Sequence, residues 1–524
     1  MRTILRGLFT LTLLALILLG ASQPGPVGAA GVVGDGTPAS CTEAALRAAL
    51  DSGGLVTFNC GGNKTILLES QLAIRADTVM DGDGQITLSG NNTTRIFHVT
   101  GGNSLTVRDM TLTNGYAVGY GGAVYVAEGA SFTADSSTIG DSQTDGFAGS
   151  AIFAIGDGAI TLRNSIVQNN RTTSFGAVNS TGPVTIENSV LRGNHSDAGG
   201  GALSVSGNVT ITGSRIEGNR TEFMVGHGGG IYVTGPVEIT DSHITGNFSG
   251  KSGGGIFATD TAIVTVNGSI ISDNFASDGS GGGVDSSGVT YLNNSTIRQN
   301  RATYEGGGIF SFGSQAFLGV FGSTISQNYS GPIGGGVYIS GQATFENTTI
   351  SHNSTGQGGG GLYISSGVVT FTNVTFNDNS SNFSGRNLHV SSQAKATVSN
   401  TIFASPSGGG NCYVFTGNAQ NPAGQLVSGG FNLDTDGTCG LKSGGDLEAP
   451  SAGLGELRDN GGDTWTHLPH LDSAAVDGGT CAGGNLAVDQ RGAPRPAGNA
   501  CDIGAVERQP GDGIYYSYVG VVIR

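Results

Sequence analysis

A short glycine-rich phrase recurs through the middle of the chain at a nearly constant interval. Two or three glycines or other small residues precede an aliphatic residue and often an aromatic one, as in residues 121–125, 228–232 and 359–363. The small residue before the aliphatic one recurs every 25 to 28 positions, at Ala123, Ala151, Ala177, Ala202, Gly230, Gly255, Gly283, Gly308, Gly336 and Gly361. A period in the twenties is typical of a solenoid, in which each repeat buries its apolar face only by stacking on its neighbours.

Two further phrases divide each repeat into strands. The first alternates β-branched residues, as in 184–186 and 264–266, and the second ends in asparagine, as in 216–219 and 297–300. Alternation with period two indicates strands. Three short strands in 25 to 28 residues predict an all-β, three-sided coil, with neighbouring coils about 4.8 Å apart.

The repeats bring side chains of one kind into register from coil to coil. Three columns of aliphatic residues are expected to point inward and to dominate the stability, at about 1.5–3 kcal/mol for each buried Val or Ile. The asparagines are expected to form a ladder at a turn, because Asn tolerates left-handed backbone and its amide can bond the amide one coil along. They are Asn170, Asn194, Asn219, Asn247, Asn274, Asn300, Asn328, Asn353 and Asn379. A parallel polar column is formed by Ser189, Ser214, Ser242, Ser269, Ser295 and Ser323.

Together, the glycine phrase and the later aliphatic-x-x-Asn phrase resemble the polymorphic outer membrane protein repeat. The resemblance covers about residues 95–390, where the two phrases recur in register. Such repeats form right-handed parallel β-helices of pectin-lyase-like architecture, so the resemblance implies that fold and a surface or secreted protein. It does not imply an enzyme. This chain mostly carries Ile in the second phrase where that family often carries Phe, which leaves the expected fold unchanged.

The first 63 residues are expected to contain a leader and a cap. Residues 1–30 combine a basic start, an apolar run over 8–19 and small residues near 28–30, which is typical of a secretory signal peptide. Residues 31–63 are expected to cap the solenoid, with a short amphipathic helix over about 41–51 that begins at Thr42 and ends before Gly53. The β-helix itself is expected over 64–413, and no transmembrane span is expected beyond the signal segment.

Six cysteines in an exported chain predict disulfides. Six cysteines allow fifteen connectivities, and pairing between sequence neighbours is favoured: Cys41–Cys60, Cys412–Cys439 and Cys481–Cys501. Each bond would close a loop of about twenty to thirty residues and contribute about 3 kcal/mol on the chain-entropy model. The sequence contains no Cys-x-x-Cys motif and no Cys/His cluster, so the cysteines do not indicate a metal site.

The repeat fails after residue 413, and the composition changes. The only tryptophan, Trp465, lies here, together with the phrases 432–439, 459–464, 489–496 and 501–507. These phrases resemble the choice-of-anchor Q domain, which commonly ends secreted bacterial β-helix proteins. The match spans about residues 387–508, and a separate region over 414–508 is expected. The resemblance implies placement in the envelope or outside the cell. Residues 472–475 lack the proline that the family usually has, so a local turn difference is expected. Residues 509–524 form an apolar tail too short to span a bilayer.

Charge and motif content narrow the functional classes. A net charge of −16 and a pI near 4.8 disfavour nucleic acid as a partner, because nucleic-acid binding requires a basic surface. No cofactor is expected. Asn432, Asp434 and Asp436 imitate the start of a calcium loop, but Ser443 stands where the bidentate Glu should be. Calcium is therefore not supported by a motif.

A carbohydrate-active enzyme is the alternative interpretation, because parallel β-helices often carry polysaccharide lyases and hydrolases. His227 between two glycines resembles the Gly-His-Gly of polygalacturonases, but the companion motifs of that family are absent. Loop charges after the asparagine ladder are expected at one edge, and most of them are expected to be solvated. They are His195, Asp197, Glu222, His227, Lys251, Asp278 and Glu305. The enzyme hypothesis requires Glu222, His227, Lys251 and Glu305 to converge in one cleft, with carboxylates about 5–10 Å apart.

An aromatic column follows the glycine phrase and is the candidate ligand-contact stripe. It comprises Tyr125, Phe153, Tyr232, Phe257, Phe310, Tyr338 and Tyr363, with Phe97 before them and with Asn179, Ser204, Asp285 and His389 at the polar interruptions. Alternation places these side chains outward, where they could stack on sugar rings or on a partner surface. The competing interpretation is that the rings only stack on one another. The sequence favours an exported, non-enzymatic β-helix that acts in adhesion, glycan binding or as an envelope spacer, secreted or attached to the cell surface, with a polysaccharide or cell-surface component as its partner.

Overall fold

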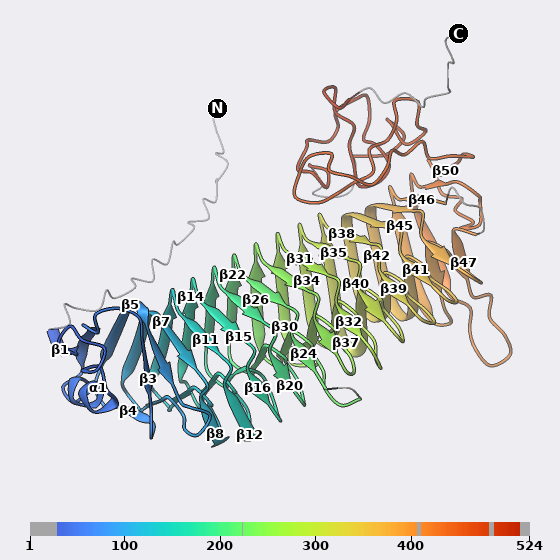
Figure 1. Ribbon diagram of the computed structural model, residues 1–524. Coiled ribbons are helices and arrows are strands. Elements are labelled where there is room, and N and C mark those ends of the chain that lie inside the picture. Colours follow the sequence, from blue (N-terminus) through green and yellow to red (C-terminus); the bar gives the residue numbers. More distant parts are fainter. Residues whose placement is uncertain (1–28, 223, 406–409, 482–486, 514–524) are drawn as a thin grey trace, which may run out of the picture.

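The chain winds into a parallel solenoid of about 15 turns, as shown by the computed structural model in Figure 1. The structure describes residues 29–222, 224–405, 410–481 and 487–513. Residues 1–28 of the expected signal peptide and most of the apolar tail therefore lie outside the described residues. Neighbouring coils pair in parallel in a 39-stranded sheet that wraps around three faces of the rod, and an eleven-stranded sheet closes the fourth side.

We call the three faces of the large sheet A, B and C, in the order in which each coil visits them. Face A follows the glycine phrase and contains β4 (Leu72–Ile74), β6 (Phe97–Val99), β9 (Val124–Val126), β13 (Ile152–Ala154), β17 (Val178–Ser180), β21 (Leu203–Val205), β25 (Ile231–Val233), β29 (Ile256–Ala258), β33 (Val284–Ser286), β44 (Leu388–Val390) and β47 (Cys412–Val414). Face B contains β1 (Ala29–Val33), β2 (Gly54–Phe58), β10 (Ser131–Asp135), β14 (Ala159–Arg163), β18 (Val184–Glu187), β22 (Val209–Thr212), β26 (Pro236–Thr240), β30 (Ile263–Asn267), β34 (Val289–Asn293), β45 (Ala394–Ser399) and β48 (Gln425–Gly430).

Face C precedes the asparagine ladder and contains β3 (Lys64–Leu67), β11 (Thr138–Gly140), β15 (Ile166–Gln168), β19 (Val190–Arg192), β23 (Arg215–Glu217), β27 (His243–Thr245), β31 (Ile270–Ser272), β35 (Thr296–Arg298), β38 (Thr324–Ser326), β46 (Ile402–Ala404), β49 (Leu433–Asp434) and β50 (Leu447–Glu448). Five long strands continue from one face to the next: β5 (Thr78–Ser89), β7 (Ser104–Thr113), β37 (Ile309–Phe321), β40 (Val337–Ser351) and β42 (Leu362–Asn377).

A fourth short strand per coil accompanies the three that the sequence predicts. These strands form the separate sheet: β8 (Tyr116–Gly119), β12 (Gln143–Gly146), β16 (Arg171–Thr172), β20 (His195–Ser196), β24 (Arg220–Thr221), β28 (Phe248–Ser249), β32 (Phe275–Ala276), β36 (Arg301–Ala302), β39 (Tyr329–Ser330), β41 (Ser354–Thr355) and β43 (Ser380–Ser381). Most have only two residues, too short for a periodic signal in the sequence.

The interior consists of the predicted aliphatic columns. In one coil, Val178, Ile186 and Leu191 point inward from faces A, B and C, and each is fully buried. Parallel pairing keeps them in register, since Ile186 pairs with Ile211 on the next coil and Leu191 pairs with Ile216. The all-β parallel solenoid predicted from the repeat is thereby confirmed.

The asparagine ladder is present, but its left-handed residue is not the asparagine. Asn247 donates its Nδ2 to the Oδ1 of Asn274 at 3.0 Å and to the carbonyl of Ile216 at 2.9 Å. Its backbone N–H also donates to Asn274 Oδ1, at 3.0 Å. The expectation of left-handed backbone at Asn was wrong, because the residue before it makes the turn: Gly246 has φ of 64° and Asp273 has φ of 57°. The ladder Asn is thus free to point inward, where its amide replaces water as the partner of buried backbone groups.

The serine column plays the same part at the corner between faces B and C. The backbone N–H of Ser242 donates to Ser269 Oγ at 3.0 Å, and Ser242 Oγ donates to the carbonyl of Thr240 at 2.7 Å. Asp241 before it adopts φ of 49°. Two corners of each coil therefore share one design: a left-handed residue followed by an inward polar side chain.

The glycine phrase forms the corner before face A. Gly228 adopts φ of 65°, and a Cβ at this position would collide with the carbonyl of Ile231. The phrase is therefore required by backbone geometry. It serves as a corner and not as a ligand-binding loop.

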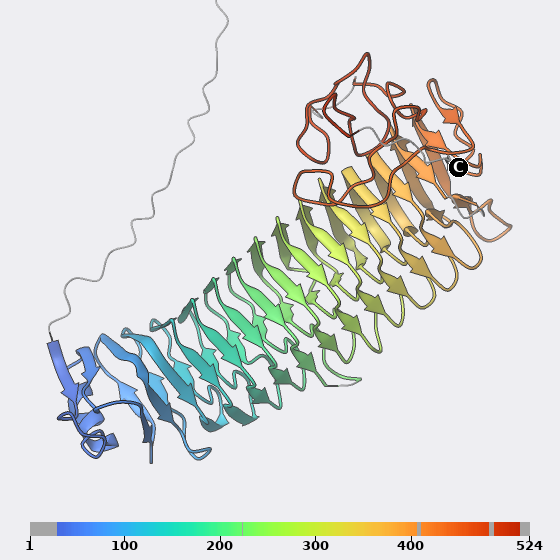
Figure 2. The same ribbon diagram turned by 45° about the horizontal axis from the view of Figure 1, so that its top comes forward.

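The first coil is capped by α1 (Glu43–Leu50), close to the expected helix. Thr42 is the N-cap, and its Oγ1 accepts from the N–H of Ala45 at 3.2 Å. Leu46 is buried against the first coil, and a disulfide links Cys41 to Cys60. Figure 2 shows the helix at one end of the rod.

The C-terminal part leaves the stack and returns along its flank. Parallel pairing continues past residue 413, through β47 to β50. The following described residues, 450–481 and 487–513, which we call the C-terminal region, form irregular loops over face C of the last coils (Figures 1 and 2). The expected pairs Cys412–Cys439 and Cys481–Cys501 are at disulfide distance. Within the described residues, no helix has the length and apolarity needed to cross a membrane.

Candidate functional site

The aromatic column lies on the outward side of face A, as predicted from the alternation. Parallel register aligns Tyr232 with Phe257, Phe310 with Tyr338, and Tyr338 with Tyr363. Phe97 is an exception: it pairs with Val124 and is fully buried, so His98 takes the outward position instead. Its expected place in the column was wrong. Thr-Arg-Ile, not the glycine phrase, precedes Phe97, and a shift of one residue moves a side chain to the opposite face.

The column contains three runs of contacting rings. The longest passes through Phe310, Tyr338, Tyr363, His389 and Tyr413, with successive centroid distances of 4.9, 5.7, 4.3 and 4.7 Å. The planes of Tyr338 and Tyr363 are nearly parallel, at 3°. Rings one coil apart thus stack face to face, so that their edges and hydroxyl groups point outward.

We call the eleven-stranded sheet, which closes the fourth side of the rod, sheet D. Side chains from the loops between sheet D and face A cover part of the column. Tyr120 packs on Phe153 at 4.2 Å, and His227 packs on Phe257 at 4.5 Å. Phe153 retains 6% of its surface, whereas Tyr338 and Tyr363 are half-buried. Tyr125 and Tyr232 are half-buried as well, so each of the three runs keeps partly accessible rings. Burial raises the pKa of Tyr338.

Asp285 interrupts the column between Phe257 and Phe310. It is 5% exposed, and burial raises the pKa of its carboxyl to about 7, against a hydrogen bond from Ser252 that lowers it. The nearby Glu305 accepts from Ser280 Oγ at 2.7 Å. Asp285 fills a ring-sized gap in the column with a carboxyl group that has little access to solvent.

The loop charges singled out in the sequence do not all converge. Glu222 and Glu305 follow β24 and β36, which are three coils apart, a separation of about 14 Å at the spacing between strands. Lys251 lies near enough to His227 to help lower the pKa of that ring, although burial is the larger cause. These carboxylates do not form the four-residue cleft that the enzyme hypothesis requires.

A different group of the loop charges does come together. His195 Nε2 lies 3.3 Å from Glu222 Oε2 and 3.6 Å from Asp197 Oδ1, and Arg171 Nη2 lies 3.6 Å from Asp197 Oδ1. Burial, followed by the charge of Arg171, lowers the pKa of His195. Ligand atoms of His195, Asp197 and Glu222 all lie within 4.8 Å of one another, a spacing compatible with a metal ion.

The protonation of His195 argues against a metal there. Arg171 Nη1 lies 2.6 Å from His195 Nδ1, and a guanidinium can only donate. Nδ1 must therefore accept, and the proton of the neutral ring resides on Nε2, where it faces the two carboxylates. A metal would bind the lone pair of Nε2, and Nδ1 would then carry the proton and donate it to an acceptor group. The group is better described as a set of close charge pairs, in which His195 Nε2 and Asp197 Oδ1 make no hydrogen bond with another described residue.

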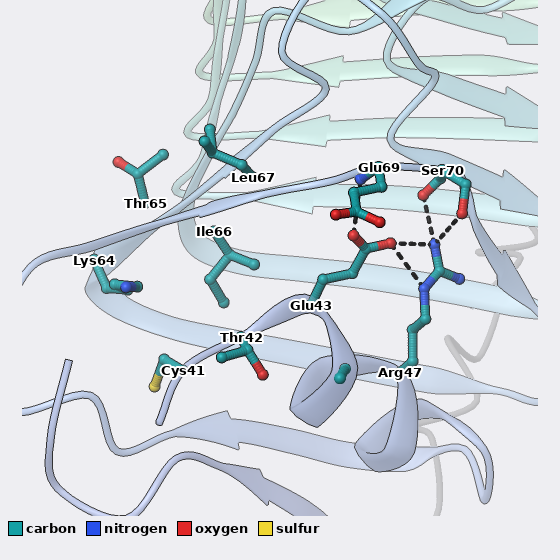
Figure 3. A pocket seen from close by; sticks show the side chains of 11 residues that line it. Cys41, Thr42, Glu43, Arg47, Lys64, Thr65, Ile66, Leu67, Glu69 and Ser70 are labelled. Atoms are coloured by element: carbon teal, nitrogen blue, oxygen red, sulfur yellow. Dashed lines mark hydrogen bonds and ion pairs between the residues drawn. The ribbon is translucent and has the colours of Figure 1, made fainter. Parts of the chain in front are cut away.

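A hollow of about 630 Å3 lies at the capped end, between α1 and β3 (Figure 3). Arg47 holds Glu43 and donates to the carbonyl of Ser70 at 2.6 Å, and the N–H of Glu69 donates to Glu43 Oε2 at 2.8 Å. Partial burial opposes ionisation of Glu43, but these donors outweigh it and lower its pKa. The hollow is the seam at which the cap is fastened to the first coil.

A Ser–His–Asp sequence of contacts occurs where the C-terminal region docks. Asp378 Oδ2 lies 3.5 Å from His352 Nε2, and His352 Nδ1 lies 2.7 Å from Ser351 Oγ. Ser351 is fully buried, however, and its Oγ also contacts His467 Nε2 at 2.8 Å. A hydroxyl enclosed in this way cannot reach a substrate, so this chain of contacts fastens the C-terminal region to the rod.

Comparison with protein families agrees with this geometry. The model of the right handed beta helix region matches residues 122–284 and 229–403, which together span more than half of the chain. The protein belongs to this right-handed β-helix family. No curated protein and no solved structure matches the chain.

Two features of the site were not predicted. The contact of Arg171 with His195 joins two coils in a sheet that the sequence did not indicate, although both residues follow ladder-turn positions. The docking surface of the C-terminal region was also missed, because it joins residues such as Ser351 and His467 that are 116 positions apart. A periodic signal marks side chains of like character one repeat apart. Arg171 and His195 are one repeat apart but differ in character, and His467 lies outside the repeats.

Proposed function

We propose that this protein is an exported, non-enzymatic β-helix rod that contacts glycans through the outward column of face A. The observation that supports this most directly is the run from Phe310 to Tyr413, with ring centroids 4.3 to 5.7 Å apart along one line. Such a line offers a ring edge at each coil, a regular set of contacts for a polymer with repeating units. Phenol hydroxyls are added at Tyr338, Tyr363 and Tyr413, where they can bond hydroxyl groups of the polymer. Adhesion or spacing at the cell envelope would follow from the rod shape.

Export and the finer family assignment belong to the same proposal. Three disulfides favour an oxidising compartment. The glycine and Ile-x-x-Asn phrases occupy fixed corners of one coil, which supports the polymorphic outer membrane protein-type repeat. The phrases at 489–496 and 501–507 meet in one buried network, in which Gln490 N–H donates to the carbonyl of Ala505 and Arg495 pairs with Glu507. This supports a choice-of-anchor Q-type region, and the kind of anchor is left open.

The stripe is tested by replacing Tyr232, Tyr338 and Tyr363 together with Ala and measuring glycan-array binding. We expect binding to be abolished. Tyr291→Ala is the matched control, because Tyr291 points outward from face B and packs against Phe317 at 5.7 Å. Binding that survives the triple substitution in folded protein would refute the stripe as the contact surface.

An enzyme acting on polysaccharide is the second candidate, favoured by one observation. Asp197 and Glu222 lie on neighbouring coils with carboxylate oxygens within 4.8 Å, close to the separation of about 5–5.5 Å found between the carboxyl groups of retaining glycosidases. Arg171 Nη2 lies 3.6 Å from Asp197 Oδ1, so this carboxylate already has an ion-pair partner. The test is incubation with a panel of polysaccharides, with and without calcium. Unsaturated or reducing-end products that disappear in Glu222→Gln would replace the binding proposal with this one.

A further inference from the structure

A second hollow, of about 380 Å3, lies between the last coils and the C-terminal region. Its floor is formed by Gln327, His352 and Asp378, which stand at the same corner of three successive coils. Each precedes a ladder asparagine and has positive φ, between 51° and 58°. Because the ladder asparagine points inward, these side chains point away from the core. We call this hollow the corner groove.

The opposite wall is held firmly in place. Thr324 Oγ1 donates to the carbonyl of Trp465 at 2.5 Å, and His467 bridges Ser351 Oγ, at 2.8 Å, and the carbonyl of Gly455, at 2.7 Å. His467 is only 2% exposed. These bonds fix the backbone on both sides of the groove, so a ligand would meet a preformed site.

Trp465 lines the groove, and 49% of its surface is exposed. It is the only tryptophan in the sequence. In the face A column, ring faces are used by neighbouring rings. Trp465 lies outside that column and keeps a large part of its indole open. An open indole beside hydrogen-bonding groups is a platform for the apolar face of a sugar ring.

The polar lining selects among sugars. Asp378 and Glu456 bring carboxylates, and Gln327 and Asn377 bring amides. Among the described residues that line the groove, none is Lys or Arg. Carboxylates and amides accept hydrogen bonds from hydroxyl groups, whereas two carboxylates without a guanidinium repel a uronate.

We propose that the corner groove binds an uncharged saccharide, stacked on Trp465 and held through its hydroxyl groups by Asp378 and Glu456. The proposal does not depend on the face A column. It assigns the docked C-terminal region a role in forming a binding site, in addition to covering the end of the rod.

The single tryptophan makes the test specific. Selectively excited tryptophan emission reports on Trp465 alone, so the full chain can be titrated with neutral oligosaccharides built from glucose, mannose, xylose or N-acetylglucosamine. An oligogalacturonate serves as the charged comparison. We expect a saturable change in emission with at least one neutral oligosaccharide, and affinity weaker by about tenfold in Asp378→Asn and Glu456→Gln, the loss of one hydrogen bond to a charged group. The oligogalacturonate is expected to give no saturable change.

Two variants separate this site from the face A column. Tyr363→Ala should leave the tryptophan titration unchanged, whereas Trp465→Ala should abolish the neutral-saccharide binding that calorimetry detects at the groove. If Trp465→Ala fails to fold, judged by circular dichroism, Trp465→Phe replaces it and is expected to weaken binding about fivefold or more, because a smaller ring covers less of the sugar. No saturable change with any neutral oligosaccharide, or an unchanged affinity in the Asp378→Asn, Glu456→Gln double variant, would overturn the proposal.

Discussion

The solenoid and the C-terminal region solve the same problem, the burial of polar groups, in opposite ways. In the solenoid, Asn247 bonds Asn274 just as Asn274 bonds Asn300, and the same contact recurs from coil to coil. In the C-terminal region each contact occurs once: Arg495 pairs with Glu507, and Arg491 pairs with Asp489. A repeated neutral ladder spreads its stability over many equal bonds. In the C-terminal region, a few unique ion pairs carry most of the stability. A single substitution there should therefore lower the free energy of unfolding by more than one in the solenoid.

The largest effect is therefore expected from Arg495→Ala. Arg495 Nη1 lies 3.0 Å from Glu507 Oε2, and both side chains are at most 1% exposed. Removing the guanidinium leaves a buried carboxylate without its counter-charge, which costs about 3–5 kcal/mol. Hydrogen exchange should show early loss of protection over 487–513, with the central coils unchanged.

The matched control is Arg163→Ala in the solenoid. Arg163 Nε lies 2.9 Å from Glu187 Oε2, but the side chains are 48% and 41% exposed. A solvated pair of this kind contributes about 0–1 kcal/mol. Equal losses in the two variants would show that the contrast between the regions does not depend on burial of charge.

Breaking the ladder at one rung should have the next largest effect. Asn274→Ala removes the acceptor for Asn247 Nδ2 and the donor to the carbonyl of Ile244. Unpartnered buried groups cost about 1–3 kcal/mol each, and shifts of the neighbouring rungs would recover part of this, so we expect a loss of about 2–3 kcal/mol in the free energy of unfolding. Chemical denaturation can measure it, with the outward Thr265→Ala as a control expected within about 0.5 kcal/mol of wild type.

The two regions should also respond to pH with opposite slopes. Burial lowers the pKa of His467 to about 4, so the folded C-terminal region binds fewer protons than the unfolded chain between pH 6.5 and 4. Its stability should fall as the pH drops through this window, by about 2 kcal/mol at pH 5. Asp502, whose pKa burial raises to about 6, acts in the opposite direction. Comparison with His467→Asn isolates the histidine: the variant should lose less protection between pH 7 and 5 than wild type does.

In the solenoid, the buried Asp285 should give a pH dependence of stability opposite to that caused by His467. Because burial raises its pKa to about 7, the folded state holds a proton that the unfolded chain releases near pH 4. This contribution to stability is full at acid pH and declines as the pH rises from about 4 to 7. The protection factors of amides near face A, which correct for the intrinsic rise of exchange with pH, should therefore fall toward neutral pH in wild type and change little in Asp285→Asn. The same slope in both proteins would show that another group titrates there.

The sequence predicts the repeating solenoid far better than the C-terminal region, in which no contact repeats. Ile271 and Asn274 could be placed inside the coil because their neighbours one repeat away have the same character. The period could not reveal that Asp273, not Asn274, takes the left-handed backbone, since either residue type tolerates it. It could not place Trp465 beside Thr324, because that contact joins a repeat to a segment without one. The rod, its columns and its aromatic line were predictable, whereas the corner groove required the structure.

The smallest effect is expected from a comparison of two glycines, which separates the cost of left-handed backbone from the cost of crowding. Gly218 precedes the ladder residue Asn219, and Gly228 belongs to the glycine phrase. Gly218 has φ of 61° and open space where a Cβ would stand, whereas a Cβ at Gly228, with φ of 65°, would meet the carbonyl of Ile231. Gly218→Ala should therefore cost only the left-handed penalty of about 1 kcal/mol. Gly228→Ala adds a collision with backbone that neighbouring coils hold in place, so its loss should be clearly larger. Equal unfolding midpoints in the two variants would mean that the glycine phrase is set by φ alone, and that close approach of the chain at the face A corner contributes nothing to its recurrence.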